Sequence, residues 1–575
     1  MLNTECRYEY RDETGSGICP ADLLALPTPS LIGTIHAVPV SLASHHHHLS
    51  SFSSHTDLSI MQRLHELPAD IVSDIYSMAA LIDSPTNKLA YPLQGMSVAG
   101  RRKKPETTVV SLGWITLTHI CRYWRHVGLD MAPLWAGVIC VFPAAFEVLV
   151  TRTRGAPLSF DFRFAGSELR RDYAVEHLNN VQSIVDFGRS NGIFWAEQLA
   201  GHSLPRLKKL ELLLDDTGEW SSLEVKDQEA LHAPALQHLT LSHGLFFPFI
   251  SPSLTGLALS ASDFRPTKGL TTISELLYLL QSMPLLSNLR LDHILAFAAP
   301  DEAQGSDDSV DLPCLTSLYY AGHEDQFIAL WKRLKVPLDL SLSVRLRKPR
   351  KNNMNSIIRT LSQHFHNPHF DTVFMSDIDY WQNETELTLT SGASDAPRVS
   401  IQSYHVNGID DSKPEHVSSL LKRIRPHLNS AESMRHFRFR GAFRYEQNST
   451  PQSLARVIDP LRHFTAVSQV NIEQMDAMLL SAVGNGEAGY LFPTLHTLSM
   501  TFAREEWGWT SSTLRGIWGT LLAALEARSE GGYQVTCLLL VGSRPAEQAL
   551  AQDDEKWKAK AGVHVKDVLD ERVYQ

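Results

Sequence analysis

Cysteine is scarce in this chain of 575 residues: there are six, and none forms a CxxC pair. The sequence therefore has neither a disulfide framework nor paired thiols for a zinc site, and it favours a reducing compartment. Long apolar runs are also missing, because the most apolar stretch, residues 127–146, contains an aspartate, two prolines and two glycines. Positive charge is not in excess, since the formal net charge is −11, which argues against a general nucleic-acid binder.

The N-terminal residues have mixed charge and no apolar core, so they do not predict a secretory signal. Together with the missing apolar runs, this predicts a soluble intracellular protein, cytoplasmic or nuclear. We expect it to bind neither a membrane nor nucleic acid.

Motifs of catalysis are missing as well. The chain has no GxSxG, GxxxxGK[ST] or HExxH motif, and no GxGxxG motif follows a strand pattern. Its 26 histidines are mostly dispersed and show no ligand or triad spacing. The sequence therefore predicts a protein that is not an enzyme and that holds no metal or cofactor.

Three parts follow one another along the chain. Residues 1–59 are rich in serine and histidine without periodicity, which predicts a disordered leader. Residues 60–136 predict a small helical unit, in which Leu67, Ile71, Ile75 and Met78 share one helix face. A polar segment at about 84–111 interrupts this unit as a flexible insert. Helical spacing then resumes at Leu117, Ile120, Cys121 and Trp124.

Repetition distinguishes residues 137–575. The pattern Pro-x-Leu-x-x-Leu-x-Leu begins at Pro205, Pro234, Pro252 and Pro284, and weaker copies begin at Pro313 and Pro493. The last two leucines of each copy are two residues apart, so a short strand would point both inward and the residue between them outward. Helical patterns lie between several copies, for example at 272–283, where Thr272 and Glu275 predict a capping box. Such alternation at roughly thirty-residue intervals predicts an irregular leucine-rich-repeat solenoid.

The fold class expected from these patterns is α+β or α/β, with a small all-α unit followed by the solenoid. A generic α/β domain with leucine-rich strands is the open alternative. The position that holds Asn or Cys in regular leucine-rich repeats is occupied by other residues, namely Asp215, Gly244, Ser262 and Ile294. The sequence therefore does not predict the curvature.

Residues 64–136 resemble an F-box. The resemblance rests on Leu67-Pro68 before the first helix, on Ile71 and Ile75, on the run HICRYWR at 119–125, and on Pro133-Leu134-Trp135. An F-box followed by degenerate leucine-rich repeats is similar to the large family of mushroom-type (basidiomycete) fungal F-box proteins. The likeness covers about residues 64–165 well and the remainder only in architecture.

The resemblance implies the substrate-recognition subunit of an SCF-type (cullin–RING) ubiquitin ligase. Its implied partners are the SCF adaptor subunit, a cullin bound through that adaptor, and an unknown target protein. The adaptor-binding residues implied are Leu67, Pro68, Ile71, Ile75, Ile120 and Trp124, and Trp135 would hold the unit to the repeats. An internal helix–helix core would use the same residue types, so that interpretation stays open for each of them.

Outward strand residues are the candidates for target binding: Glu211, Thr240, Arg290 and Tyr319, together with Arg438 and Arg440 in the run HFRFR. The two arginines form a basic stripe that could bind an acidic or phosphorylated segment, or could simply face solvent. Two other functions stay open. One is a non-degradative interaction scaffold, and the other is a hydrolase or transferase within residues 335–490, where the repeats are faintest.

Overall fold

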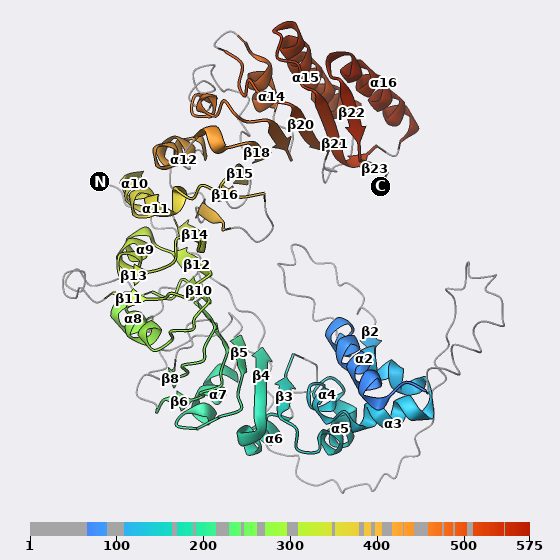
Figure 1. Ribbon diagram of the computed structural model, residues 1–575, viewed down its shortest axis with the longest axis vertical. Coiled ribbons are helices and arrows are strands. Elements are labelled where there is room, and N and C mark those ends of the chain that lie inside the picture. The colour runs from blue at the N-terminus through green and yellow to red at the C-terminus, as the bar shows by residue number, and fades with distance from the viewer. Residues whose placement is uncertain are drawn as a thin grey trace, which may run out of the picture. The chain divides into compact units, whose positions relative to one another are not determined.

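The computed structural model describes residues 66–88, 109–163, 170–187, 191–213, 229–242, 247–261, 271–295, 309–347, 351–378, 384–392, 397–404, 417–428, 431–441, 458–473, 477–486, 489–502, 510–545 and 547–574. From Leu67 onward the described residues belong to one structural unit, whose helices and strands are labelled in Figure 1. The expected leader at 1–59 and most of the expected insert lie outside the described residues.

The N-terminal part is mainly helical. Its elements are α2 (Ala69–Ile82), the 3₁₀ helix η1 (Gly113–His119), α3 (Arg122–Asp130), α4 (Ala132–Ala136) and α5 (Phe146–Thr153). The short strands β1 (Thr86–Lys88) and β2 (Val109–Ser111) pair in antiparallel fashion, with Thr86 opposite Ser111. The ends of the expected insert therefore lie side by side. The expectation of an all-α unit was wrong here, because β1 and β2 form a two-stranded sheet within it.

Leu117, Ile120, Cys121 and Trp124 have helical spacing but do not lie on one helix. Gly113 has a φ of +52°, and a Cβ there would lie 2.4 Å from the carbonyl oxygen of Asp83. Cys121 is extended and caps α3, where its Sγ accepts a hydrogen bond from the Trp124 amide at 3.5 Å. The apolar spacing from Leu117 to Trp124 thus crosses a break between η1 and α3.

Aromatic rings fill the core of this helical part. Tyr76 of α2 lies 6.1 Å from Trp114 and 5.9 Å from Trp124, measured between ring centroids. Trp135 of α4 lies 4.8 Å from Trp114, and its Nε1 donates to the Gly128 carbonyl at 2.9 Å. A side chain at Gly128 would meet the Tyr76 ring at 2.7 Å, so glycine allows α2 and α3 to approach closely.

A large sheet, mostly parallel, makes up the rest of the fold. Its strands are β3 (Leu158–Asp161), β4 (Val181–Phe187), β5 (Lys209–Leu213), β7 (His238–Leu241), β9 (Gly256–Ser260), β10 (Asn288–Asp292), β12 (Ser317–Gly322), β14 (Ser341–Arg347), β15 (Thr372–Ile378), β16 (Glu384–Thr390), β17 (Val399–Tyr404), β18 (His436–Arg440), β19 (Gln469–Ile472), β20 (Thr497–Phe502), β21 (Cys537–Arg544) and β22 (Asp567–Asp570). The last strand, β23 (Val573–Tyr574), also pairs with β21.

Strand order follows chain order except in one place. From β3 to β14 each strand pairs in parallel with the next in this series. The strand next to β14 is β17, followed by β16 and β15 in antiparallel ladders, and β15 then pairs in parallel with β18. From β18 to β22 the pairing is again parallel and in chain order. The small sheets β6 (Leu231–His232) with β8 (Phe249–Ile250), and β11 (Val310–Asp311) with β13 (Leu334–Lys335), lie outside this order.

Each proline–leucine copy forms a strand, as the sequence predicted: β5, β7, β9, β10, β12 and β20. The last two leucines of the first copy, Leu210 and Leu212, are buried, and their counterparts in the other copies are buried as well. The first leucine of each copy, such as Leu207, is buried too. The inward direction of these side chains is therefore confirmed.

Helices connect many of the strands: α6 (Arg171–Glu176), α7 (Asn191–Leu199), α8 (Ile273–Gln281), α9 (Glu324–Trp331), α10 (Lys351–Thr360), α11 (Ser362–Phe365), α12 (Val417–Ile424), α14 (Ala477–Gly484), α15 (Ser511–Glu530) and α16 (Gln548–His564). The capping box of α8 is present, with both Thr272 and Glu275 bonded as expected. In Figure 1, α8, α9 and α12 lie along the same side of the strands that they connect. The architecture is thus mixed α/β with a large, mainly parallel sheet.

In the ranges that the structure describes, no helix has both the length and the apolar character needed to cross a membrane.

Candidate functional site

The first candidate surface is an apolar stripe on α2, made of Ile71, Ile75, Met78 and Ile82. These residues have the spacing of one helix face. Ile71 is 43% exposed, Met78 62% and Ile82 84%, and Ile75 is half-buried. The core side of α2 is instead formed by Val72 and Tyr76, which are fully buried. This group will be called the α2 stripe.

The other residues expected to bind an adaptor lie in different environments. Pro68 is exposed and precedes α2, while Leu67 is half-buried and its carbonyl accepts a hydrogen bond from the Tyr123 hydroxyl at 2.9 Å. Ile120 is 37% exposed at the break between η1 and α3. Trp124 is only 3% exposed, because its ring packs against Tyr76 in the core. Its side chain therefore positions α3 against α2 and offers almost no surface to a partner.

Trp135 lies on α4 and packs beside the helix that follows. It is 1% exposed, and the guanidinium of Arg152 on α5 lies 4.6 Å from the centroid of its ring. This cation–π contact joins α4 to α5 within the helical part.

The second candidate surface is a row of outward residues across five adjacent strands. In register, Glu211 lies opposite Thr240, Thr240 opposite Ala258, Ala258 opposite Arg290, and Arg290 opposite Tyr319. All four residues that the sequence singled out on these strands therefore lie in one row. Four strand spacings at about 4.8 Å give the row a length of about 19 Å.

Charge in this row is balanced within pairs. Lys209 Nζ lies 3.1 Å from a Glu211 oxygen, and Arg290 Nη2 lies 3.1 Å from an Asp292 oxygen. The Arg290 guanidinium also stacks on the Tyr319 ring at 4.3 Å. Burial raises the pKa of Tyr319, and nearby Asp292 raises it further against the effect of two arginines. Tyr319 is thus a neutral phenol at neutral pH.

A hollow of about 480 Å³ follows this row. Its centre is β9, whose outward residues Gly256 and Ala258 are small, while larger side chains on both sides form its walls. A Cβ at Gly256 would lie 2.8 Å from Nδ1 of His238, so the His238 ring covers this glycine.

Sequence reasoning missed a second outward row, two residues earlier on the same strands: Lys209, His238, Gly256, Asn288 and Ser317. The two-residue strand period would have identified it.

The structure does not bring Arg438 and Arg440 to the same place. Four strands lie between β12 and β18, which corresponds to about 24 Å along the sheet. Arg438 is exposed but ion-paired with Glu473, and its guanidinium lies 5.6 Å from the centroid of the Phe374 ring. Arg440 is exposed, and within the described ranges no carboxylate pairs with it. The expected basic stripe is therefore half neutralised.

A further hollow lies at the edge of the region considered for a hidden enzyme. It measures about 520 Å³, and its lining includes Trp331, Thr360 and His364. His364 is 5% exposed, packs edge-on against Trp331 at 5.2 Å, and has no hydrogen-bond partner at Nδ1. Burial lowers its pKa despite a backbone hydrogen bond to Leu338. The described contacts are those of a neutral histidine packed in a core.

No family model matches the chain. A search of curated proteins finds no match to it either. The surfaces above therefore have to be interpreted from their own geometry.

Proposed function

We propose that this chain is the substrate-recognition subunit of an SCF-type (cullin–RING) ubiquitin ligase. The α2 stripe would bind the adaptor subunit, and the adaptor would bind the cullin. The outward row from Glu211 to Tyr319 would hold a target protein. The observation that carries the proposal is the exposed α2 stripe, which lies within the segment that resembles an F-box.

Single exposed apolar residues are common on protein surfaces and need no function. The α2 stripe is different because its members are spaced as neighbours on one helix face, and Leu81 beside them is 87% exposed. Contiguous apolar patches of this kind are typical of binding sites. Full burial of one such side chain contributes about 1.5–3 kcal/mol, so a few of them can support a stable complex.

We further propose that the sheet and its connecting helices form a leucine-rich-repeat solenoid. The support is that every proline–leucine copy supplies one strand and that most strands pair in chain order. A sheet of this kind offers a continuous row of outward residues to a protein ligand. The ligase would then act by proximity, because a bound target is kept at high effective concentration near the ubiquitin-charged enzyme.

The test is binding of the full chain to purified SCF adaptor, measured by biolayer interferometry. Replacement of two exposed residues, Ile71→Lys with Met78→Lys, should weaken binding at least tenfold, because each lysine would have to be desolvated at the interface. A matched control is Tyr278→Lys on α8, since Tyr278 is 82% exposed and lies outside the stripe. It should bind the adaptor like the wild type.

A folded wild-type chain that never binds the adaptor would overturn the ligase proposal. If the adaptor binds but no target is lost in a cullin-dependent way, a non-degradative interaction scaffold becomes the better account. The same α2 stripe and the same sheet row would then serve in assembly only.

A further inference from the structure

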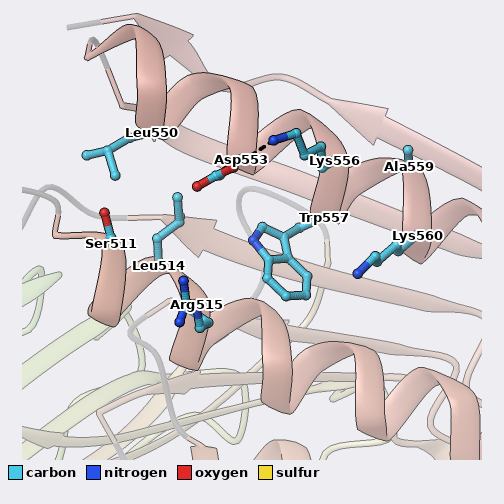
Figure 2. Close-up of a pocket in the computed structure, with 9 residues that line it drawn as sticks. All are labelled: Ser511, Leu514, Arg515, Leu550, Asp553, Lys556, Trp557, Ala559 and Lys560. Atoms are coloured by element: carbon cyan, nitrogen blue, oxygen red, sulfur yellow. Dashed lines mark hydrogen bonds and ion pairs between the residues drawn. The ribbon is translucent and has the colours of Figure 1, made fainter.

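A surface groove lies between the last two long helices, α15 and α16, far along the chain from the α2 stripe. Its hollow measures about 460 Å³, within the range of about 300–1,000 Å³ that is common for ligand pockets. Figure 2 shows α15 and α16 facing each other across it, with Trp557 between them. The lining comprises Ser511, Leu514, Arg515, Leu550, Asp553, Lys556, Trp557, Ala559 and Lys560.

One end of the groove is apolar. Leu514 of α15 and Leu550 of α16 are buried in its floor, and Figure 2 shows them at the same end of the hollow. The half-buried Trp557 ring adds a flat apolar surface next to them. This floor is suited to one or two apolar side chains.

The rim of the groove is cationic on both sides of Trp557, with Arg515 next to Leu514 and Lys560 beyond the ring (Figure 2). Arg515 and Lys560 are exposed, and Lys560 Nζ lies 4.5 Å from the centroid of the Trp557 ring. Lys556 Nζ pairs with Asp553 at 3.0 Å. In the described ranges, no carboxylate pairs with Arg515 or Lys560. Among the described residues that line it, the groove therefore carries three cations against one carboxylate.

The carboxylates of α16 that could neutralise these cations are held elsewhere. Asp554 accepts from Trp518 Nε1 at 2.8 Å and pairs with Arg572 at 2.8 Å. Glu555 pairs with Lys558 at 2.6 Å and with Arg544 at 3.4 Å. Asp554 and Glu555 thus lie on one side of α16, and the cations of the groove lie on the other. The chain as a whole has a net charge of −11, so this local cationic site stands out against an acidic background.

We propose that this groove binds an acidic, apolar peptide segment of a partner protein. A leucine or phenylalanine of the segment rests on Leu514, Leu550 and Trp557, and aspartates or glutamates on either side of it pair with Arg515 and with Lys560. The groove is open at its rim, since the Lys556 side chain is 71% exposed. An extended chain can therefore enter between the helices. This site goes beyond the proposed function, because it involves neither the α2 stripe nor the sheet row.

The test uses fluorescence anisotropy with a fluorescein-labelled peptide, Ser-Gly-Glu-Leu-Glu-Phe-Gly-Ser, and its counterpart with glutamine in place of glutamate. The full wild-type chain should bind the acidic peptide with a Kd of about 10–100 μM, corresponding to about −5.5 to −7 kcal/mol. The glutamine peptide should bind at least tenfold more weakly. Raising the salt concentration should also weaken binding of the acidic peptide.

Two variants probe the cationic rim and the apolar floor of the groove. The double change Arg515→Glu with Lys560→Glu alters only exposed residues and should reduce affinity for the acidic peptide at least tenfold. Trp557→Ala should reduce affinity for both peptides. The matched control, Lys332→Glu with Lys422→Glu, makes the same change in net charge at exposed positions outside the groove and should bind like the wild type.

Three results would overturn the proposal: no binding of the acidic peptide to the folded wild type, equal affinity for the two peptides, or unchanged affinity in the Arg515/Lys560 variant. Melting temperatures of all variants show whether the fold is intact. Adaptor binding is a separate measurement, so failure here leaves the proposed ligase function to its own test.

Discussion

Tyr76 shows how a single residue links two helices that are distant in sequence. Its side chain is fully buried, and its hydroxyl donates to the Trp124 carbonyl at 3.0 Å. Burial raises the pKa of Tyr76 to about 12, and the nearby Cys121 thiol adds to the effect. The folded state therefore favours the neutral phenol, whereas the unfolded chain would ionise near pH 10.

The pH dependence of stability follows from this raised pKa. The contribution of neutral Tyr76 is complete below about pH 10 and is lost as pH rises from about 10 towards 12. Tyr76→Phe should cost about 1 kcal/mol at pH 8 through the lost hydrogen bond, but its stability should fall less steeply above pH 10. Urea unfolding followed by tryptophan fluorescence at several pH values measures this. Identical slopes in the two proteins above pH 10 would contradict the assignment.

At the scale of elements, Arg528 ties α15 to its neighbours. It is 0% exposed and donates to the carbonyls of Val483, Leu491 and Phe492 at 3.1, 2.8 and 3.0 Å, and to that of Tyr533 at 3.1 Å. Burial lowers the pKa of Arg528 to about 10. One side chain thus donates hydrogen bonds to backbone carbonyls at the end of α14, in the segment before β20 and in the turn after α15.

Removing this guanidinium should destabilise the protein. Arg528→Met leaves four carbonyls without their donor, and each unsatisfied buried group costs about 1–3 kcal/mol, so we expect a loss of about 4 kcal/mol or more. The stability of Arg528→Lys should lie between that of the wild type and that of Arg528→Met, because an ammonium cannot reproduce the planar fork of donors. Urea midpoints measure the effect. The exposed Arg359→Met is the control and should change stability by no more than about 0.5 kcal/mol. A midpoint for Arg528→Met equal to that of the control would be inconsistent with this role.

At the scale of the whole molecule, a buried ionic cluster closes the C-terminal end of the sheet. Arg572 is 5% exposed and Asp554 2% exposed, and Arg572 also pairs with Asp570 at 2.9 Å. Burial alone would raise the pKa of Asp570, but hydrogen bonds from Arg572 and Arg544 outweigh it and hold the pKa far below its usual range. Removing one partner of such a cluster costs about 3–5 kcal/mol.

Thiol labelling can show whether the two ends of the molecule unfold separately. Burial raises the pKa of the Cys140 thiol to about 12, whereas Cys314 is exposed and Cys537 lies on β21 beside β22. In native wild type, Cys314 should react with iodoacetamide at least about a hundredfold faster than Cys140, because thiolate is the reactive form.

In Arg572→Ala, Cys537 should become reactive at a lower urea concentration than Cys140, since strands contact mainly their neighbours. Peptide mass spectrometry reads each site. Labelling of Cys140 and Cys537 at the same urea concentration in this variant would instead indicate one cooperative unit.

Local spacing was enough to predict much of this fold. The proline–leucine copies predicted six strands and the direction of their side chains, because a strand repeats every two residues whatever surrounds it. Thr272 and Glu275 predicted the start of α8 for the same reason, since a capping box needs only four consecutive residues. The row of Glu211, Thr240, Arg290 and Tyr319 also followed from the repeated position of these residues in their copies.

Contacts between distant segments decided the rest. The pattern of α2 indicated an apolar face, but whether that face is covered depends on η1 and α3, which pack against Tyr76 and leave most of the α2 stripe exposed. The spacing also placed Leu117 and Trp124 on one helix face, although the helical backbone is interrupted at Cys121. The antiparallel order of β15, β16 and β17, the four carbonyls around Arg528, and the groove between α15 and α16 have no local signature. Each depends on which segments meet in space, and residue spacing along one segment carries no information about its partner.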